Sequence, residues 1–416
     1  MKINSCIICI IFMTNLIFSN SATQFRCGTN DLTIKPKHLE PKIEINEADS
    51  SYKRRMDDID EDGFKKFNIY VDKVNIGTDL IIYNMVEYSD IIFNSLDKAA
   101  GTLQKLLKVK PLKDHLRIYP NDLYNIGIYS WDRKKFGTIL DMSMHGIDLI
   151  IFPKIAYLGK DIIAQASLSY TQAENDQPVL GIVKINRYIN FTMPNIEKYI
   201  ESTLIHEFTH ILGFLGLFFN LFNMTTTKED KYGIKRTYIN SPKVVEAARK
   251  YFNCCELDGV ELEDYGGNGT AGSHWESRIL LGDYMNGIFY PEEVISDITL
   301  ALLEDLGYYK AYYYTGGLMS YGKNKGCEFV HDKCVDQTTY EINPKFENEF
   351  FDELYTKNEY DPSCTSGRLS RMYNISWLYQ NIPEEYQYYN GNIRVGGWRA
   401  ADYCPVQLMI MMKKQK

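Results

Sequence analysis

The sequence predicts an α+β protein, with a mixed α/β N-terminal half and a C-terminal half that is held together by disulfides. Two apolar runs rich in β-forming residues, 148–155 and 179–185, are each bounded by turn residues, as buried strands are. A long helical pattern follows between Asn195 and Gly213. Six of the nine cysteines lie beyond residue 250, so most cross-links would fall in the second half of the chain.

Shorter patterns complete the predicted N-terminal half. Residues 67–71 alternate between apolar and polar side chains, which indicates a strand. Residues 95–109 have the spacing of a helix that buries one face. The side chains on that face are Leu96, Ala99, Ala100, Leu103, Leu106 and Leu107. A further helix is expected from about residue 293 to residue 306, because Gly307 is a natural stop.

The helix after residue 194 carries both a start and a stop signal. Asn195 is a good N-cap, and Glu197 lies in the first turn, where the helix dipole favours an acidic side chain. Gly213 can adopt the left-handed conformation that ends a helix. The apolar stripe of this helix contains Ile196, Tyr199, Ile200 and Leu204.

Length and composition are those of an ordinary globular protein. The chain has 416 residues, 45% of them hydrophobic and 24% charged, which is enough for a sizeable core and two or three domains. It carries 46 lysines and arginines against 54 aspartates and glutamates, a net charge of −8. Nucleic-acid binding depends on a basic surface. Nucleic acid is therefore not an expected partner.

The N-terminus has the features of a targeting segment. Residues 1–21 contain Lys2, an apolar run and then small residues at the expected cleavage point, which is the pattern of a signal peptide. The alternative is an uncut membrane anchor, although a span needs about 20 apolar residues. Residues 22–62 are polar and charged, and suit either a removable prosegment or a linker that is never cleaved. The sequons at Asn190, Asn223, Asn268 and Asn374 fit the secretory route.

The number of cysteines in the mature chain depends on removal of this N-terminal segment. Cys6 and Cys9 would leave with the signal peptide, so seven cysteines remain in the mature chain. The six in the C-terminal half could form three disulfides in any of 15 arrangements, although a bond between the adjacent Cys254 and Cys255 would be strained. Cys27 is then left over.

One short motif carries a recognisable chemistry. His206-Glu207-Phe208-Thr209-His210 lies on the predicted helix, where residues four apart share a face, so both imidazoles can bind one metal ion. Glu207 would lie beside the metal rather than on it. Zinc activates a water molecule, and a neighbouring carboxylate can remove its proton and later protonate a leaving amine. The alternative is a pair of solvated helix histidines.

A third metal ligand is expected outside this helix. His274 is the best candidate, because residues 266–274 form a glycine-rich approach that can bring the backbone close to a site. Met285 follows in a turn-forming context, although a lone methionine usually belongs to a core. The acidic run 261–264 could suggest calcium, but a solvated turn is favoured. No partner spacing supports the other mature histidines, which are His38, His115, His145 and His331.

Together these motifs resemble the leishmanolysin family, the metzincin-type zinc endopeptidases of protozoan surfaces and their relatives. The resemblance rests on His206-Glu207-x-x-His210-x-x-Gly213-Phe214, on residues 272–276 and on a Met-turn at Met285. The 60 residues between Gly213 and His274 match the long insertion of this family. Further similarity extends over residues 253–257, 261–264, 305–309, 326–334 and 401–406.

The resemblance implies roles for individual residues. His206, His210 and His274 would bind one zinc ion per chain, Glu207 would be the catalytic base, and Met285 would form a hydrophobic floor under the metal. These positions imply a metzincin-like catalytic domain, with a twisted mixed sheet and a zinc-binding helix. Residues 163–170 look like the family's edge strand, which pairs with an extended substrate. Cys27 could block the metal in the precursor, and otherwise would be an unpaired or intermolecular thiol.

The expected protein is a secreted or cell-surface zinc metalloendopeptidase made as a zymogen, with protein or peptide substrates and possible membrane association. The alternative is a catalytically silent adhesion protein with a structural zinc, which would not need Glu207. The apolar end of the chain, residues 406–413, is too short for a lipid-anchor signal of about 10 to 20 residues. The expected order is a signal peptide (1–21), a prosegment (22–62), a catalytic subdomain (63–215), an insertion with the third ligand and Met-turn (216–290), and a disulfide-rich domain (291–416).

Overall fold

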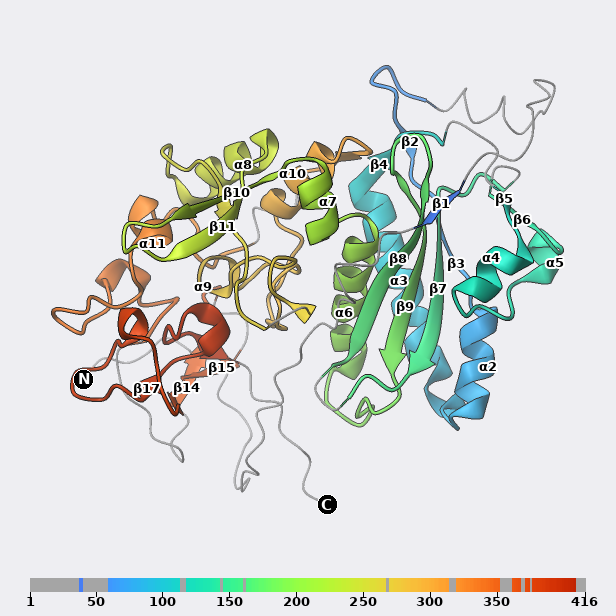
Figure 1. The fold of residues 1–416 in the computed structure, drawn as a ribbon. Helices are drawn as coiled ribbons and strands as arrows, with labels where there is room; N and C mark the ends of the chain where they lie inside the picture. Colours follow the sequence, from blue (N-terminus) through green and yellow to red (C-terminus); the bar gives the residue numbers. More distant parts are fainter. Residues whose placement is uncertain are drawn as a thin grey trace. The chain divides into compact units, whose positions relative to one another are not determined.

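The computed structural model divides the chain into two compact units (Figure 1). The sheet unit comprises described residues within 37–223 and 300–313, and the disulfide unit comprises those within 224–299 and 319–408. The predicted signal peptide, Cys27 and most of the predicted prosegment lie outside the described residues. The structure describes residues 37–39, 59–112, 117–142, 145–159, 162–266, 269–313, 319–351, 361–367, 371–374 and 376–408.

A five-stranded mixed sheet forms the centre of the sheet unit. Its order is β1 (Lys37–Leu39), β8 (Ala164–Gln172), β9 (Pro178–Asn186), β7 (Leu149–Ala156) and β3 (Ile69–Val71). β8 and β9 are antiparallel, and the other neighbouring pairs are parallel. The two predicted apolar strands are confirmed as β7 and β9, which lie side by side and are almost wholly buried.

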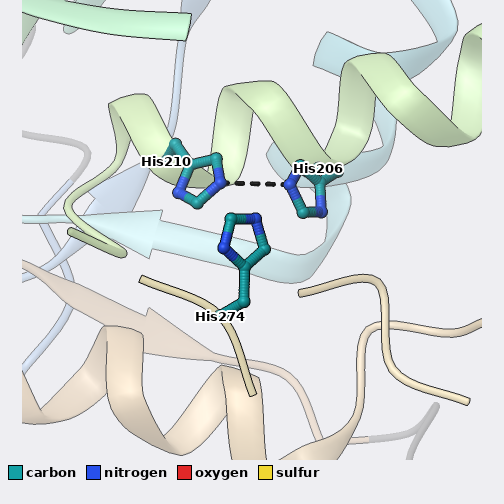
Figure 2. Close-up of side chains that lie close together, drawn as sticks. All are labelled: His206, His210 and His274. Carbon is teal, nitrogen blue, oxygen red and sulfur yellow. Dashed lines mark hydrogen bonds between the residues drawn. The ribbon is translucent and has the colours of Figure 1, made fainter. Parts of the chain in front are cut away.

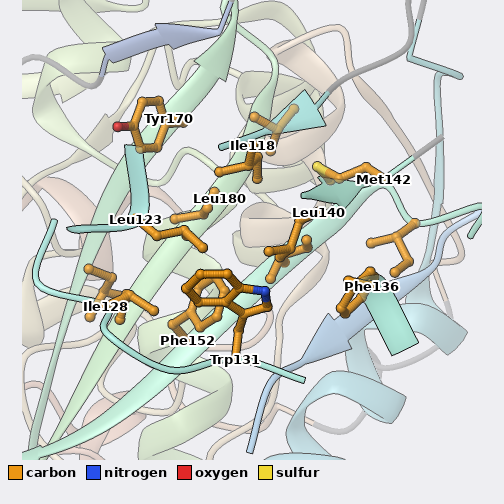
Figure 3. Close-up of a cluster of buried hydrophobic side chains, with 14 of the residues drawn as sticks. Ile118, Leu123, Ile128, Trp131, Phe136, Leu140, Met142, Phe152, Tyr170 and Leu180 are labelled. Atoms are coloured by element: carbon orange, nitrogen blue, oxygen red, sulfur yellow. The ribbon is translucent and has the colours of Figure 1, made fainter. Parts of the chain in front are cut away.

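One face of this sheet is covered by the chain between β4 (Leu107–Val109) and β7, which the sequence patterns did not predict. Ile150 and Phe152 of β7 alternate with Ile151, which points to the opposite face. Figure 3 shows that Phe152 and Leu180 pack against Trp131 and its neighbours. The covering elements are β5 (Arg117–Ile118), α4 (Pro120–Asn125), α5 (Arg133–Phe136) and β6 (Leu140–Asp141).

The other face is packed against helices, which are α2 (Val74–Ile82), α3 (Ser89–Leu106) and α6 (Ile196–Ile211). Gly181 of β9 faces α6, and a Cβ atom built on it would lie 2.4 Å from Cγ2 of Ile211. This glycine lets α6 lie close to the sheet. The apolar stripes predicted for α3 and α6 are buried, as expected.

Element boundaries differ from the predictions in three places. α3 begins at Ser89 and ends at Leu106, because Leu107 turns extended and starts β4 (Leu107–Val109) between β2 (Lys65–Lys66) and β13 (Tyr309–Ala311). Asn195 precedes α6 but has a left-handed φ of 59° and makes no side-chain cap, so its predicted capping bond is wrong. α10 (Asp297–Asp305) begins after Val294, whose backbone pairs instead with Gly282 and Tyr284.

Short elements make up the disulfide unit. β10 (Thr225–Glu229), β11 (Lys235–Ile239) and β12 (Val260–Glu261) form one antiparallel sheet, and α8 (Pro242–Phe252) connects its last two strands. The remaining elements include α9 (Ser277–Leu280), α11 (Cys327–His331), β14 (Asp361–Cys364), β15 (Arg371–Asn374), β16 (Trp377–Leu378), β17 (Val395–Gly396) and β18 (Gln407–Leu408). In the sheet unit, α7 (Gly216–Leu221) follows α6.

Disulfides cross-link this unit, as the sequence predicts, but not in three pairs among its six cysteines. Cys254 bonds to Cys327 and Cys334 bonds to Cys404, across 73 and 70 residues. Cys364 is also disulfide-bonded. Cys255 is an exposed free thiol, so the expectation that all six pair with one another is wrong. Its neighbour Cys254 is buried against α11, and adjacent side chains cannot both reach that side.

Membrane and glycosylation signals have different outcomes in the described residues. The stretch Ile196–Leu221 has the length and hydropathy of a membrane span, but 72% of its most apolar window is buried in the protein, as in a core helix.

Of the predicted sequons, Asn190 and Asn223 are exposed and Asn374 is buried. Asn268 lies outside the described residues.

Candidate metal centre

Two histidines project from one face of α6. His206 and His210 are one helical turn apart, and both are buried. Their Nε2 atoms lie 3.0 Å apart, and their rings are nearly perpendicular, at 84° (Figure 2). The spacing of the motif therefore produces a pair of imidazoles whose ring nitrogens converge on one point.

The backbone fixes the tautomer of His210. Its Nδ1 lies 2.7 Å from the carbonyl oxygen of Phe214. Because a carbonyl can only accept, Nδ1 carries the hydrogen and donates it, which leaves a lone pair on Nε2. Metal-binding histidines usually donate their second ring N–H in this way. His210 is therefore held in the form that binds a metal through Nε2.

Gly213 makes this contact possible. It has a φ of +117°, which favours glycine, and the chain turns back so that the Phe214 N–H donates to the carbonyl of Thr209. The Gly213 N–H donates to the carbonyl of His210. The turn brings the Phe214 carbonyl within hydrogen-bond distance of the His210 imidazole. A Cβ atom at Gly213 would also lie 2.8 Å from Cδ1 of Leu306.

His274 is positioned by a second turn, in which a backbone carbonyl again accepts a hydrogen bond from the Nδ1 atom of the ring. It is fully buried, and its Nδ1 lies 2.9 Å from the carbonyl oxygen of Thr270 and 3.1 Å from the hydroxyl of Ser273. Its Nε2 therefore also keeps a lone pair. Gly272 has a φ of +74° in this turn. The predicted glycine-rich approach is thus a tight turn that sets the direction of the His274 ring.

The three imidazoles form a compact set of possible metal ligands. One ring nitrogen from each of His206, His210 and His274 lies within 4.8 Å of the others. Figure 2 shows the His274 ring directed toward the two helix histidines. Zinc–nitrogen bonds of about 2.0 to 2.1 Å in a tetrahedral site separate two nitrogens by about 3.3 Å. The donor atoms and two of the tautomers therefore fit a zinc ion.

Glu207 and Met285 lie at the positions that the sequence analysis singled out. Glu207 follows His206 on α6, about 100° around the helix axis, and is fully buried. Met285 is fully buried too, and its carbonyl accepts a hydrogen bond from the N–H of Trp275, the residue after His274. Asp283 accepts the Met285 N–H at 2.6 Å. The turn that contains Met285 is thereby tied to the segment that carries His274.

The other histidines are not part of this set. His145 is exposed and packs edge-on against Phe136. His331 is exposed at the end of α11, between two disulfide cysteines. The side chains of His38 and His115, and Cys27, lie outside the described residues.

The burial of a second polar cluster was missed by the sequence analysis. The acidic run 261–264 is not the solvated turn that was expected, because Glu261 and Glu263 are buried. Arg236 lies 2.9 Å from Glu261, and burial together with the neighbouring carboxylates raises the pKa of Glu263. The local pattern gave no sign of burial, since Arg236 comes from β11, a separate strand.

Comparisons with known proteins agree with the motif resemblance. A family model described as leishmanolysin, peptidase M8, matches residues 92–410. A leishmanolysin homolog of Crithidia fasciculata is 34% identical over 235 residues, which cover 56% of this chain and 34% of that protein. A leishmanolysin-like peptidase of Drosophila melanogaster is 29% identical over 298 residues, covering 58% of this chain and 43% of that protein.

A third relative, leishmanolysin of Leishmania major, is 27% identical over 267 residues, covering 62% of this chain and 41% of that protein. The chain therefore spans between 34% and 43% of the length of these three relatives. The candidate centre, from His206 to Met285, lies wholly within the range matched by the family model.

Proposed function

This chain belongs to the leishmanolysin family, a family of metalloproteases, and from that membership we propose that it is a zinc-dependent endopeptidase acting on extended polypeptides. The observation that carries the proposal is the convergence of three histidine nitrogens within 4.8 Å, with His210 and His274 both donating Nδ1–H to backbone carbonyls. That arrangement is typical of a metal site.

His206, His210 and His274 would hold the zinc ion. When bound, zinc supplies a Lewis acid and an activated water. Three neutral imidazoles leave a fourth position open for that water or for a substrate carbonyl, as in catalytic zinc sites. The donor set contains no thiolate, which is the more frequent ligand of closed structural sites.

Glu207 is the proposed general base. Its carboxylate would take a proton from the attacking water and return it to the nitrogen of the leaving amine, so that one side chain serves both halves of the reaction. Its place next to His206 on a buried helix keeps it in a fixed position relative to the histidines. A protein that kept zinc only as a structural element, such as an adhesion protein, would have no use for this carboxylate.

β8 is the proposed strand for substrate pairing. Its neighbour β1 pairs only with Tyr170 to Gln172, so within the described residues no strand lies on the outer side of Ala164 to Leu168. An extended peptide can add to such an edge through main-chain hydrogen bonds. β8 also packs against α6, the helix that carries two of the three proposed zinc ligands.

We also propose that the chain enters the secretory route and is made as a zymogen. Lys37–Leu39, within the proposed prosegment 22–62, pairs with the far end of the same strand β8. A prosegment bound there would lie along the edge that a substrate needs.

The decisive test compares Glu207→Gln with the parent protein after removal of the prosegment. The variant should keep one zinc per chain by metal analysis and lose casein hydrolysis. Glu197→Gln is the matched control, because Glu197 is exposed on the same helix and should leave hydrolysis unchanged. A chelator should abolish casein hydrolysis by the parent, and added zinc should restore it. Undiminished hydrolysis by Glu207→Gln would refute the assignment.

A further inference from the structure

A group of carboxylates lies in the disulfide unit, apart from the histidine set. One carboxylate oxygen from each of Glu263, Asp264 and Glu276 lies within 4.8 Å of the other two. Glu263 and Glu276 are buried, at 2% and 0% exposure, whereas the Asp264 side chain is 48% exposed. Two of the three carboxylates are therefore shielded from water, and the third is partly exposed to it.

Backbone pairing brings these carboxylates together. The N–H of Glu263 donates to the carbonyl of His274 at 3.0 Å, and the N–H of Gly272 donates to the carbonyl of Glu263 at 2.8 Å. The N–H of Glu276 donates to the carbonyl of Glu261 at 3.1 Å. The acidic run is thus hydrogen-bonded, through the backbones of Glu261 and Glu263, to the segment that carries His274.

The two nearby arginines form ion pairs with Glu261, Asp402 and, within the group, Asp264. Arg236 binds Asp402 at 2.8 Å and Glu261 at 2.9 Å, and it reaches Asp264 at 3.2 Å. Arg278 lies 3.4 Å from both Glu261 and Asp402. In the part of the chain that the structure describes, no lysine or arginine forms an ion pair with Glu263 or with Glu276. Arg236 and Arg278 interact with Glu276 only over a longer distance, so neither buried carboxylate has a directly bonded cation among the described residues.

The hydrogen bonds of these two carboxylates are also incomplete. Glu263 accepts from the Tyr265 N–H at 3.0 Å and from the Ser277 hydroxyl at 3.1 Å. Oε1 of Glu276 accepts the Arg278 N–H at 3.0 Å. Its Oε2 is buried and accepts no hydrogen bond from any described residue. Leaving a charged carboxylate oxygen dry and unpaired is costly, and a bound cation or a proton would remove that cost.

We propose that Glu263, Asp264 and Glu276 bind a divalent cation of the calcium type. All three donors are oxygens, which hard cations prefer, and no histidine or cysteine accompanies them. Calcium–oxygen bonds of about 2.3 to 2.6 Å allow two ligand oxygens to lie up to about 5 Å apart, which accommodates the observed spacing. The exposed side at Asp264 admits the water molecules that complete the coordination. Two positive charges would also balance Glu263 and Glu276.

Such a cation would stabilise the segment that positions the third histidine. Glu276 lies two residues after His274, and Glu263 is paired with the His274 carbonyl. A cation that bridges the two would join both sides of this backbone pairing. Binding should therefore slow amide hydrogen exchange in residues 261–263 and 272–276.

The test uses the full-length, zinc-loaded chain, passed over a chelating resin and checked for retained zinc. Calcium chloride is titrated into it and followed by calorimetry, and terbium is used as a luminescent calcium probe that the neighbouring Tyr265 can sensitise. One calcium per chain should bind, with a Kd of about 10⁻⁴ to 10⁻³ M as in extracellular modules. The same addition should slow exchange in residues 272–276.

Two variants and one control locate the site. Glu276→Gln should abolish calcium and terbium binding, and Asp264→Asn should weaken both by about tenfold because one charged ligand is lost. Asp264 is half-exposed, so its variant tests the site even if Glu276→Gln fails to fold. Glu246→Gln, on the exposed side of α8, should bind as the parent does. Absence of calcium binding at about 10 mM, ten times the weakest expected Kd, or equal binding in Asp264→Asn and the parent, would overturn the proposal.

Discussion

The carbonyl oxygen of Phe214 lies 2.7 Å from Nδ1 of His210. This contact connects the end of α6 to the chemistry of its last histidine, because it fixes the tautomer that exposes Nε2. It depends on Gly213, whose positive φ turns the chain back toward the helix. The glycine of the motif therefore serves ligand orientation as well as helix termination.

Replacing this glycine should weaken zinc binding. In Gly213→Ala the new methyl group would lie 2.8 Å from Leu306, and a φ of +117° disfavours alanine, so the turn and the Phe214 carbonyl must shift. Loss of such a supporting contact typically costs about 10- to 100-fold in metal affinity. Zinc affinity is measured by competition with a chromophoric chelator.

Gly307→Ala is the control for this prediction. Gly307 also has a positive φ, of +82°, but a Cβ atom there meets nothing within 4 Å. It should lose about 1 kcal/mol of stability from backbone strain and keep the zinc affinity of the parent. An equal loss of zinc affinity in both variants would show that strain alone, and not the position of Phe214, is responsible.

A second glycine sets the distance between α6 and the sheet. In Gly181→Ala the Cβ atom would lie 2.4 Å from Cγ2 of Ile211, so the variant should unfold at lower denaturant concentration, with a loss of about 1 to 3 kcal/mol from overpacking. Adding Ile211→Val removes the Cδ1 atom, at 2.7 Å, but keeps both γ carbons, so it should recover only a small part of this loss.

Gly101→Ala is the matched control for the packing prediction. Gly101 lies within α3, and a Cβ atom there meets nothing within 4 Å, so alanine should stabilise the helix by about 0.5 to 1 kcal/mol. Denaturant unfolding of all four proteins measures both effects. If Gly181→Ala proved as stable as Gly101→Ala, the close approach of α6 to β9 at Gly181 would make no contribution to stability.

The predictable parts of this molecule are those encoded in local periodicity. The apolar runs that became β7 and β9 are long enough to be recognised, and the four-residue spacing of His206 and His210 determines their shared helix face. By contrast, α4, α5, β5 and β6 have between two and six residues each, too few for a period to show. Only the packing of Trp131 and its neighbours on the sheet fixes them.

Burial of polar residues was the least predictable feature of the site. Glu261 looks like part of a solvated turn because its partner Arg236 is distant in sequence, on β11, and Arg236 in turn binds Asp402, far along the chain. Cys255 shows the same limit, since its sequence does not tell which of two adjacent cysteines faces α11. Such properties arise from tertiary contacts, which a single sequence does not display.

Asp60 should give the protein a specific sensitivity to acid. The side-chain hydrogen bond from Lys108, at 2.8 Å, and the Phe64 N–H lower the pKa of Asp60 to about 2 from 3.8. A carboxyl with a lowered pKa in the folded state adds stability above its unfolded pKa and loses it as it becomes protonated. Its contribution should therefore be complete above pH 3.8 and disappear as the pH falls toward about 2.

Asp60→Asn should flatten this part of the stability profile. Denaturant unfolding at several pH values measures the slope, and Asp90→Asn, at an exposed position on α3, is the control that should keep the slope of the parent. A slope in Asp60→Asn that equals the parent's between pH 4 and 2 would show that the ion pair with Lys108 adds no stability in solution.

Zinc should stabilise the fold through His274 as well as through His206 and His210 of α6. A ligand that binds only the folded state adds about 2.7 kcal/mol when its concentration is 100 times Kd, so the parent should show a higher Tm with zinc than after chelation. His274→Ala removes one of three ligands and should lose most of this increase. His331→Ala, at an exposed histidine of the same disulfide unit, should retain it. If zinc raised the Tm of His274→Ala as much as that of His331→Ala, the third ligand would have to come from elsewhere in the chain, and the turn at Thr270 would have no role in metal binding.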